Sequence, residues 1–481
     1  MIDNLDHDVT QMEVADALIE LHGGSVRFDT GSQTWLTFDE QHGWSWDHHL
    51  HGMRTLVEQT LRHLEKAAPK RLRGKANEVE REKFMALRRR EVRQHMKNGT
   101  VGSILKVAET RQAVHCRPED IDAVPHLLGT PNGVVDLRTG ELTAFDRSML
   151  ITKRTAASPD ATITPERFAR FISEVLNNDA EAAAAFQRLG GYLLTGETHH
   201  QQMWILEGSG SNGKSTLLSL LQGIFGPGYS QQAPEAVLMA RTHPGGTSGE
   251  LVRLKGVRCA ILTETGHGQR LNEERVKQLV AADRIAAREL YKGFEEFVPQ
   301  AKYLLATNHL PVVRGSDDGI WRRLVVIPFR NRFEVGSDPT LMADLKAEAD
   351  GILAWLIEGA KAWYASGRVL VTPAAWVQAT RDYRSEQDDI SAFVAAQCTK
   401  KAAAFVGATE LYDAFRCWCL EEDREALTQQ EFGARLMTTG LVERRRKGKA
   451  NRWHYVGLAL RHPAPKEATV PPSLPLASSQ V

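Results

Sequence analysis

The segment from Gly208 to Thr216, GSGSNGKST, constrains the fold of this chain more than any other part of the sequence. It fits the pattern G-x-x-x-x-G-K-[ST] in full. An apolar segment, MWILE (203–207), precedes it, and a helical pattern, STLLSLLQGIF, follows its lysine. This order predicts a strand, a phosphate-binding loop and a helix, and therefore an α/β fold of the P-loop NTPase type.

The residue types of this loop suit a nucleoside triphosphate. Glycines let the backbone wrap closely with its amides pointing at phosphate, and the helix N-terminus adds a positive dipole end. We expect Lys214 to reach the β- and γ-phosphates and the Ser215 hydroxyl to bind Mg²⁺. The predicted cofactors are therefore ATP and Mg²⁺. The predicted cofactor-binding residues are Gly208, Ser209, Gly210, Ser211, Asn212, Gly213, Lys214, Ser215 and Thr216.

Two further apolar segments end in polar side chains. RCAILTET (258–265) carries Glu264 near its end, and AKYLLATN (301–308) ends in Asn308. Both are apolar on both faces, as central strands of a parallel sheet are, and ligand sites form at the carboxyl ends of such strands. Glu264 is a candidate for holding Mg²⁺ or positioning water, and Asn308 for sensing the γ-phosphate. The alternatives are an exposed acid at a strand end and a turn residue before His309.

Two adjacent arginines, Arg322 and Arg323, come directly before another apolar strand in GSDDGIWRRLVVIPF (315–329). An arginine from a neighbouring subunit can stabilise the transition state of hydrolysis. An ion pair with Asp317 or Asp318 explains the same residues, and position alone does not decide between the two.

The order of five segments resembles that of the superfamily 3 helicases, and most of all the helicase part of phage and plasmid primase–helicases, which are related to the poxvirus primase–helicase. These segments are GSGSNGKST, ILTET, LNEERVKQLVAADRIAARELYKGFEEF, LLATNHLP and GIWRRLVVIPF. The stretch PNGVVDLRTGEL also resembles the domain that precedes the helicase in this family. The motifs span about 200–330, and the resemblance as a whole covers about 40–460.

The resemblance implies an AAA+-like homo-hexameric ring that hydrolyses ATP to translocate on single-stranded DNA and to unwind forked DNA, usually 3′ to 5′. It implies that Lys214 and Ser215 bind nucleotide, that Glu264 is the catalytic acid and Asn308 the sensor. It assigns the arginine finger to Arg322 or Arg323, and a DNA-contacting hairpin to the segment with Tyr291 and Lys292 near its tip.

Two departures from the family pattern matter. Many relatives carry two adjacent acids at the place where Glu264 stands between Thr263 and Thr265, so the second Mg²⁺ ligand is open. No primase catalytic domain is recognisable, which makes priming doubtful and leaves room for a separate primase partner.

The C-terminal part resembles a winged helix, in which the family often ends. Apolar periodicity at Leu411, Phe415 and Trp418 predicts one helix, and a second helix, a strand, a basic loop and a strand follow. We predict that the basic loop contacts DNA phosphates, although an exposed charged turn is the alternative. The predicted contacts are Arg444, Arg445, Arg446, Lys447 and Lys449.

We therefore expect five regions. They are an N-terminal, mostly helical α+β domain (1–155), a helical collar (156–200), the ATPase core (201–372), a winged-helix-like domain (373–461) and a disordered tail (462–481). In the first region a charged helical stretch over 51–98 carries a cluster of arginines, which is better explained as a solvated helix face than as a phosphate site. Asp120 and Asp122 indicate a surface loop rather than a metal site.

Composition removes several classes of function. Lys plus Arg and Asp plus Glu both number 60, so the chain is no general polycation, although local basic patches can still bind nucleic acid. Five cysteines without a CxxC pair argue against disulfides and zinc and favour the cytoplasm. The resemblance to phage and plasmid proteins implies that this is the cytoplasm of a bacterial host. No signal peptide and no membrane span is expected. Two other functions stay open: an origin-binding initiator whose ATPase serves assembly only, and a P-loop small-molecule kinase.

Overall fold

The computed structural model describes residues 10–71, 78–240, 248–263, 266, 268–288, 294–315, 318–334, 336, 338–422, 424–447 and 451–462. The chain divides into two compact units, one made of 1–311 with 323–377 and the other of 312–322 with 378–481. No helix in the described ranges is long and apolar enough to cross a membrane. The predicted tail beyond residue 462 lies outside them.

The N-terminal part combines a small sheet with four helices. The helices are α1 (Gln11–His22), α2 (His51–Arg71), α3 (Glu78–His95) and α4 (Asn98–Ala108), and the strands are β1 (Val26–Asp29), β2 (Thr34–Asp39), β3 (Gly43–Trp46) and β4 (His115–Cys116), ordered β3-β2-β1-β4. Their shared core contains Leu18, Trp35 and Ile104.

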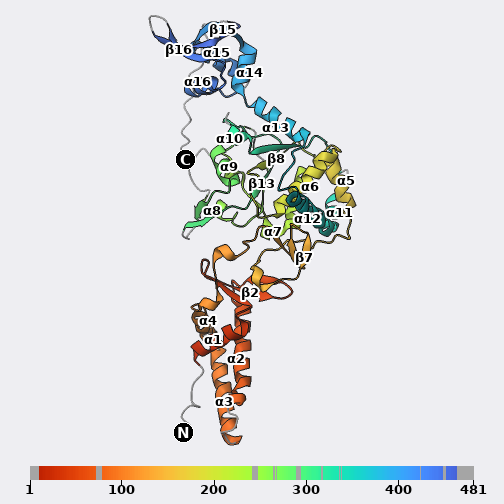
Figure 1. Cartoon of the computed structure of the whole chain (residues 1–481), viewed down its shortest axis with the longest axis vertical. Coiled ribbons are helices and arrows are strands. Elements are labelled where there is room, and N and C mark those ends of the chain that lie inside the picture. The colour runs from red at the N-terminus through yellow and green to blue at the C-terminus, as the bar shows by residue number, and fades with distance from the viewer. Residues whose placement is uncertain are drawn as a thin grey trace, which may run out of the picture. The chain divides into compact units, whose positions relative to one another are not determined.

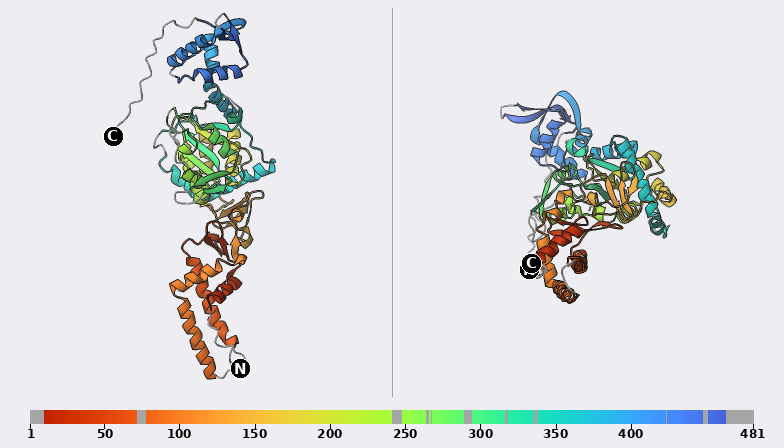
Figure 2. Two further views of the ribbon diagram at one scale, coloured as in Figure 1. Left: turned by 90° about the vertical axis from the view of Figure 1, so that its left-hand side faces the viewer. Right: turned by 60° about the horizontal axis from the view of Figure 1, so that its bottom comes forward.

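The charged stretch 51–98 forms more than the one helical segment that the sequence suggests. Helix α2 ends at Arg71, and α3 begins at Glu78 and lies beside α2 (Figure 1). The same pair is seen from the side in Figure 2.

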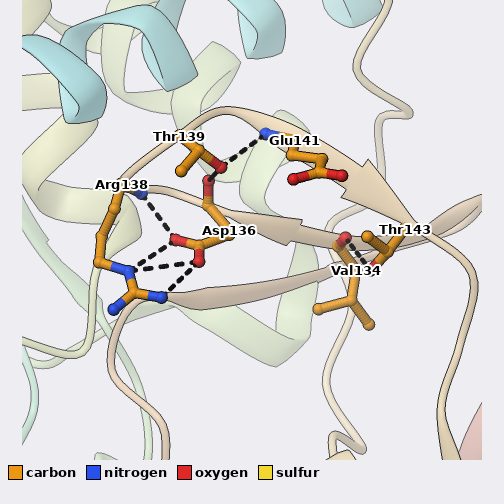
Figure 3. A network of polar contacts seen from close by, with 6 residues as sticks. All are labelled: Val134, Asp136, Arg138, Thr139, Glu141 and Thr143. Atoms are coloured by element: carbon orange, nitrogen blue, oxygen red, sulfur yellow. Dashed lines mark hydrogen bonds and ion pairs between the residues drawn. The ribbon is translucent and has the colours of Figure 1, made fainter.

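A three-stranded meander follows, and the stretch PNGVVDLRTGEL supplies its last two strands. Its strands are β5 (Leu127–Thr130), β6 (Gly133–Asp136) and β7 (Glu141–Thr143), in that order in the sheet. The turn between β6 and β7 is fixed by polar contacts (Figure 3): the Arg138 backbone N–H donates to Asp136 Oδ1 over 2.9 Å, and Arg138 Nη2 lies 2.6 Å from Asp136 Oδ2. The Glu141 N–H donates to the Thr139 hydroxyl.

The central sheet is parallel throughout. Its strands are β8 (Met203–Glu207), β9 (Ser230–Gln232), β10 (Cys259–Thr263), β13 (Lys302–Thr307) and β14 (Leu324–Pro328), ordered β14-β8-β13-β10-β9. Nearly every residue of β8, β10, β13 and β14 is buried, which confirms the prediction of central parallel strands. From β8 the chain passes through α7 (Lys214–Tyr229) to the edge strand β9. The last strand, β14, lies on the opposite side of β8, so the strand order changes direction at β8. Ligands bind at the carboxyl ends of strands beside such a change of direction.

Helices cover one face of this sheet and share a core with it. They include α5 (Glu166–Val175), α6 (Ala180–Leu194), α7, α11 (Leu341–Ala347) and α12 (Ala349–Ala365). The first two confirm the helices predicted within 156–200. Helices α6 and α12 lie side by side (Figure 1). They approach so closely at Gly191 that a Cβ on this residue would lie only 2.0 Å from the Ala360 nitrogen.

Smaller elements complete this unit. They are α8 (Ser248–Val252), α9 (Glu273–Val280), the antiparallel pair β11 (Ile285–Arg288) and β12 (Phe294–Phe297), and the 3₁₀ turns Gln112–Val114, Pro118–Asp120, Arg147–Met149 and Glu235–Val237. The pair β11–β12 forms the hairpin that the family resemblance implies.

The second unit combines helices with an antiparallel sheet. Its elements are α10 (Asp318–Trp321), α14 (Asp389–Gln397), β15 (Cys398–Gly407), α15 (Ala408–Glu421), α16 (Gln429–Thr438), β16 (Glu443–Lys447) and β17 (Arg452–Leu460), and α13 (Ala374–Glu386) leads into it. The sheet order is β15-β17-β16. The core joins Phe393, Phe415 and Phe432, and Cys419 is buried in it.

Two predictions for this unit are wrong in detail. Strand β15 was not expected, because its sequence CTKKAAAFVG is rich in the helix formers lysine and alanine and is mostly exposed, so it lacks the alternation of a half-buried strand. The basic run from Arg444 to Lys447 lies in strand β16 and not in a loop, since its backbone pairs with residues 452–455 of β17. Charged residues are common on edge strands such as this one.

Candidate functional site

The loop between β8 and α7 has a conformation that needs its glycines. Gly210 and Gly213 have φ angles of +101° and +86°. A Cβ on Gly213 would also lie 2.5 Å from Val175 Cγ1. A Cβ on Gly208 would lie 2.4 Å from the Phe329 carbonyl oxygen. The loop therefore keeps the backbone exposed toward the carboxyl edge of the sheet while it packs against α5.

Hydrogen bonds attach this loop to the neighbouring strands. The Gly208 N–H donates to the Thr307 carbonyl at the end of β13, over 3.3 Å. After β14, the Phe333 N–H donates to the Ser211 carbonyl over 2.7 Å, and Asn212 Nδ2 donates to the Phe329 carbonyl over 3.3 Å. The loop is thus held from both sides of β8.

The Lys214 ammonium lies at the centre of the site and is only 5% exposed. Its Nζ donates to the Gly208 carbonyl (2.7 Å), to Asn212 Oδ1 (2.9 Å) and to Asn308 Oδ1 (3.2 Å). Burial lowers the pKa of Lys214, and the nearby Glu207 carboxylate partly opposes that effect. Because all three acceptors are neutral oxygens, the positive charge is available to attract an anion.

A cavity of about 320 Å³ opens beside this ammonium. Its walls come from the loop, from the first turn of α7 and from the ends of β10 and β13. The lining residues are Gly210, Ser211, Asn212, Gly213, Lys214, Ser215, Thr216, Thr263, Ala306, Thr307 and Asn308. The structure thus brings most of the predicted phosphate loop together with Asn308, whereas the exposed Ser209 and the buried Gly208 do not line the described part of this cavity.

Two lining threonines were missed by sequence reasoning. Thr263 and Thr307 stand at the ends of β10 and β13, directly before the predicted Glu264 and Asn308. The same strand-end position that singled out Glu264 and Asn308 would have found them. The Thr307 hydroxyl donates to the His309 carbonyl over 2.6 Å, which fixes the turn that carries Asn308.

A divalent cation would meet the Ser215 hydroxyl at the N-terminus of α7, where the cavity is open to solvent. Glu264, the other predicted ligand, lies outside the described residues. Within the described ranges no three side chains of the His, Cys, Asp or Glu type form a metal-binding group. A hydroxyl and a triphosphate are oxygen donors, which suit Mg²⁺.

The two predicted arginines lie at the other edge of the sheet. Leu324 of β14 pairs with Met203 of β8 and Pro328 pairs with Glu207, so Arg323 precedes the strand end opposite to the glycine loop. Its carbonyl accepts a hydrogen bond from the Met203 N–H over 2.8 Å. A strand of this length spans about 16 Å. Neither arginine lines the cavity among the described residues.

Of the two aspartates that could pair with these arginines, the structure describes Asp318. The Asp318 carboxylate lies 2.7 Å from Arg384 Nη2, and the Arg322 side chain is exposed. Asp317 is not among the described residues. The ion pair that the structure gives to Asp318 is therefore with an arginine of α13.

The predicted DNA-contacting hairpin is described up to its tip. Ile285 pairs with Phe297 and Arg288 with Phe294 in the β11–β12 ladder. Tyr291 and Lys292 lie between the two strands and outside the described residues.

The predicted basic segment of the second unit has an aromatic partner. The guanidinium carbons of Arg444 and Arg446 lie 4.4 and 4.6 Å from the ring centroid of Trp453. Arg445 instead pairs with Glu443 over 2.5 Å. Sequence reasoning assigned Trp453 only to a strand and missed this contact, because cross-strand register is not visible in the sequence.

Two further basic residues complete the predicted segment. Lys447 Nζ lies 3.6 Å from the Phe405 ring centroid, on the sheet face opposite to Trp453. Lys449 lies outside the described residues.

Of the four arginines clustered on α3, two are paired within the fold and two are exposed. Arg88 pairs with Glu91 over 2.9 Å and Arg89 with Glu65 over 3.4 Å, while Arg90 and Arg93 are exposed on α3. This is the solvated helix face that the sequence favours.

The paired acids near residue 120 are also engaged. Asp120 pairs with Arg117, and Asp122 accepts hydrogen bonds from the N–H and the hydroxyl of Thr152. They hold local structure, in agreement with the interpretation as a loop.

Comparison with known families gives two matches. Residues 15–177 match the family described as D5 N terminal like, and residues 206–323 match the Family of unknown function (DUF5906). The first covers the N-terminal part, and the second runs from the end of β8 to the paired arginines.

The curated relatives are viral proteins. "Putative helicase L207/L206" of Acanthamoeba polyphaga mimivirus is 27% identical over 325 residues, which is 62% of this chain and 33% of that protein. "Putative helicase 022R" of Frog virus 3 is 28% identical over 44% of this chain and 23% of its own length. "Putative primase C962R" of African swine fever virus (isolate Tick/Malawi) is 26% identical over 46% and 24%. The chain thus spans a third or less of each of these relatives.

Among solved structures, "The apo structure of NrS-1 C terminal region (305-718)" aligns over 94% of this chain and 99% of that chain, with a TM-score of 0.49 and 12% identity.

The family matches and the viral relatives support a relation of this chain to the D5-like primase–helicases. The parallel sheet with its flanking helices fits an α/β NTPase-like fold.

Proposed function

We propose that this chain is an ATP-dependent DNA helicase of phage or plasmid replication. The observation that carries this proposal is the cavity in which Lys214 is held by Gly208, Asn212 and Asn308. Glycine-loop amides, a buried ammonium and a helix N-terminus converge there, and together they suit a triphosphate. The names of the viral relatives support the helicase part of the proposal.

In the proposed reaction the γ-phosphate of ATP competes with Asn308 for the Lys214 ammonium. The amide of Asn308 then turns to the attacking water or to the γ-phosphate. Ser215 and Glu264 would hold Mg²⁺, which would supply positive charge to the triphosphate, and Glu264 would also orient the attacking water. Binding energy is thereby directed at the charge that develops as the phosphoryl group leaves.

Arg322 or Arg323 acts on the nucleotide of a neighbouring subunit. The support is geometric, because Arg323 lies at the amino edge of the sheet whereas the cavity of its own chain lies at the carboxyl edge. A closed head-to-tail ring brings these two opposite surfaces together at every interface, and we propose a homo-hexamer of this kind.

DNA is contacted at two places in this proposal. The β11–β12 hairpin presents Tyr291 and Lys292 to the single strand in the ring channel. The element order α14–β15–α15–α16–β16–β17, with two antiparallel strands after a pair of helices, supports a winged helix whose basic β16 contacts DNA. A separate primase and a bacterial cytoplasm complete the proposed setting.

One experiment separates this function from its alternatives. ATP hydrolysis is measured with and without single-stranded DNA, and strand displacement is measured on a forked duplex. We expect hydrolysis stimulated by the single strand together with displacement. Hydrolysis without displacement would favour an assembly ATPase at an origin. Phosphate transfer to a small molecule without any response to DNA would favour a kinase.

A further inference from the structure

Trp453 lies between two arginines on one face of the β16–β17 hairpin. In the ladder Arg446 is directly opposite Trp453, and Arg444 is opposite Tyr455, so all four side chains share that face. The Trp453 side chain is 39% exposed although it is a large apolar group. Within the described ranges no carboxylate pairs with Arg444 or Arg446, whereas Arg445 on the other face pairs with Glu443. The two guanidiniums are therefore available to a phosphate.

A cavity of about 590 Å³ lies beside this face. Arg444 and Tyr455 supply its wall on the hairpin side. The other lining residues come from α15 and α16 and are Ala408, Gln429, Gln430, Phe432, Gly433, Ala434 and Met437. The wall is apolar apart from the guanidinium, the two glutamine amides and one hydroxyl. A concave apolar surface with a few polar groups is typical of ligand sites.

We infer that this cavity and the Trp453 indole bind unstacked nucleobases of single-stranded nucleic acid. The inference rests on the proposed DNA-helicase function and deepens it, because it specifies the strand form that this unit recognises. An exposed base stacks on an aromatic ring, and this contact tolerates any base because every base has a π-face. Bases inside a duplex are already stacked and cannot make it.

Arg444 and Arg446 can contact both a bound base and the phosphate next to it in the nucleic acid. An incoming base replaces one guanidinium on the indole, and the freed guanidinium pairs with the adjoining phosphate. A second base enters the cavity, where the amides of Gln429 and Gln430 can hydrogen-bond its edge. The competing explanation is that the stack of Arg444, Trp453 and Arg446 only stabilises an exposed hairpin, which predicts no dependence on bases.

The test compares strands that differ only in their bases. Binding of the full chain, without nucleotide and in the presence of a chelator, is measured by fluorescence anisotropy. The probes are oligothymidylate, an abasic strand of the same length and charge, and a blunt duplex. The variant Trp453→Leu keeps an apolar side chain on the hairpin but removes the aromatic face. Phe405→Leu is the matched control, since Phe405 is equally exposed beside Lys447 but on the opposite face.

We expect Trp453→Leu to weaken oligothymidylate binding by about tenfold and to leave abasic-strand binding unchanged. Phe405→Leu should leave both unchanged. An equal loss on both strands, or an unchanged ratio of the two affinities, would overturn the inference and leave Trp453 a structural residue. A loss confined to the duplex would overturn it in favour of duplex recognition.

The result is independent of the proposed catalytic function. Trp453→Leu should hydrolyse ATP without DNA at the wild-type rate, because the residue is no part of the Lys214 cavity. A base-dependent loss in Trp453→Leu combined with full hydrolysis by Lys214→Ala would keep this inference and remove the proposed ATPase. If Trp453→Leu showed no base-dependent loss while Lys214→Ala lost hydrolysis, the inference would be removed and the proposed ATPase would be kept.

Discussion

Lys214 Nζ and Asn308 Oδ1 are joined by a hydrogen bond of 3.2 Å. This contact connects the helix that follows β8 with the residue that follows the neighbouring strand β13. A phosphate oxygen would compete with the Asn308 amide for the same ammonium. In the proposed function, Asn308 therefore responds to the presence of the nucleotide.

Asn308→Ala should reduce the turnover of ATP far more than its binding. The amide acts on the γ-phosphate or the attacking water, and removing one such polar group costs on the order of 100-fold in kcat. Affinity should change only a few-fold, because the glycine loop and Lys214 remain. Steady-state hydrolysis and fluorescent-nucleotide titration measure the two quantities. A variant that loses both equally would show that Asn308 only supports the loop.

A pair of glycine substitutions tests the packing beneath the site. Gly191→Ala should lower the free energy of unfolding by about 2 kcal/mol or more, because its Cβ would lie 2.0 Å from the Ala360 nitrogen in α12. Gly223→Ala is the matched control in the exposed face of α7, with no atom within 4 Å of its Cβ. That substitution should stabilise the protein by about 0.5–1 kcal/mol. Chemical denaturation measures both, and equal effects would contradict the close approach of α6 and α12.

Lys153 should make stability depend on pH in the alkaline range. Burial lowers the pKa of Lys153 from 10.5 to about 8, with Asp122 opposing the shift. Below pH 8 the folded protein bears the full cost of the buried charge. Between pH 8 and 10.5 the unfolded chain binds more protons than the folded one, so stability rises with pH.

The comparison that isolates this effect uses Lys153→Met. Melting temperatures of both proteins are recorded across this pH range, and the difference between them should shift in favour of the wild type as pH rises. Parallel curves would show that the Lys153 ammonium is no more costly in the folded chain than in the unfolded one. The Lys153 contact with the Gly256 carbonyl is lost in the variant at every pH, so only the slope is informative.

Mixing two inactive variants tests action between subunits. Arg323→Ala and Lys214→Ala are each expected to be inactive, and mixed rings contain interfaces with an intact cavity on one side and an intact arginine on the other. ATP hydrolysis should partly return on mixing. The same mixture is made with Arg322→Ala, because the sequence does not rank the two arginines. Absence of recovery with either, in rings that have exchanged subunits, would mean that these arginines act within their own chain.

The sequence predicts those parts of the site that follow strand ends. Lys214 was found from the glycine-loop motif, and Asn308 was found because a buried parallel strand, a continuous apolar run, directly precedes it. Thr307 carries the same signal and was overlooked. By contrast, the packing of Gly213 against Val175 joins the glycine loop to α5, which lies far from it in the sequence, and no local pattern encodes it.

In the second unit, the sequence fails to predict one strand and the contacts that depend on how strands are paired. Helices α15 and α16 were predicted from the periodicity of their buried residues, whereas β15 was missed because its exposed lysines and alanines carry no strand pattern. The contact of Trp453 with Arg444 and Arg446 depends on the register of two strands. Register is set by the hairpin as a whole and not by the residues of either strand alone.

The most direct test of the central proposal is hydrolysis of ATP by the wild type and by Lys214→Ala, each with and without single-stranded DNA. The ammonium of Lys214 contacts the cavity and not the apolar core, so the variant should fold and melt like the wild type. We predict that the wild type hydrolyses ATP faster in the presence of the strand and that the folded variant is inactive under both conditions. Near-normal hydrolysis by the folded Lys214→Ala protein would contradict the assignment of this cavity as the site of ATP hydrolysis.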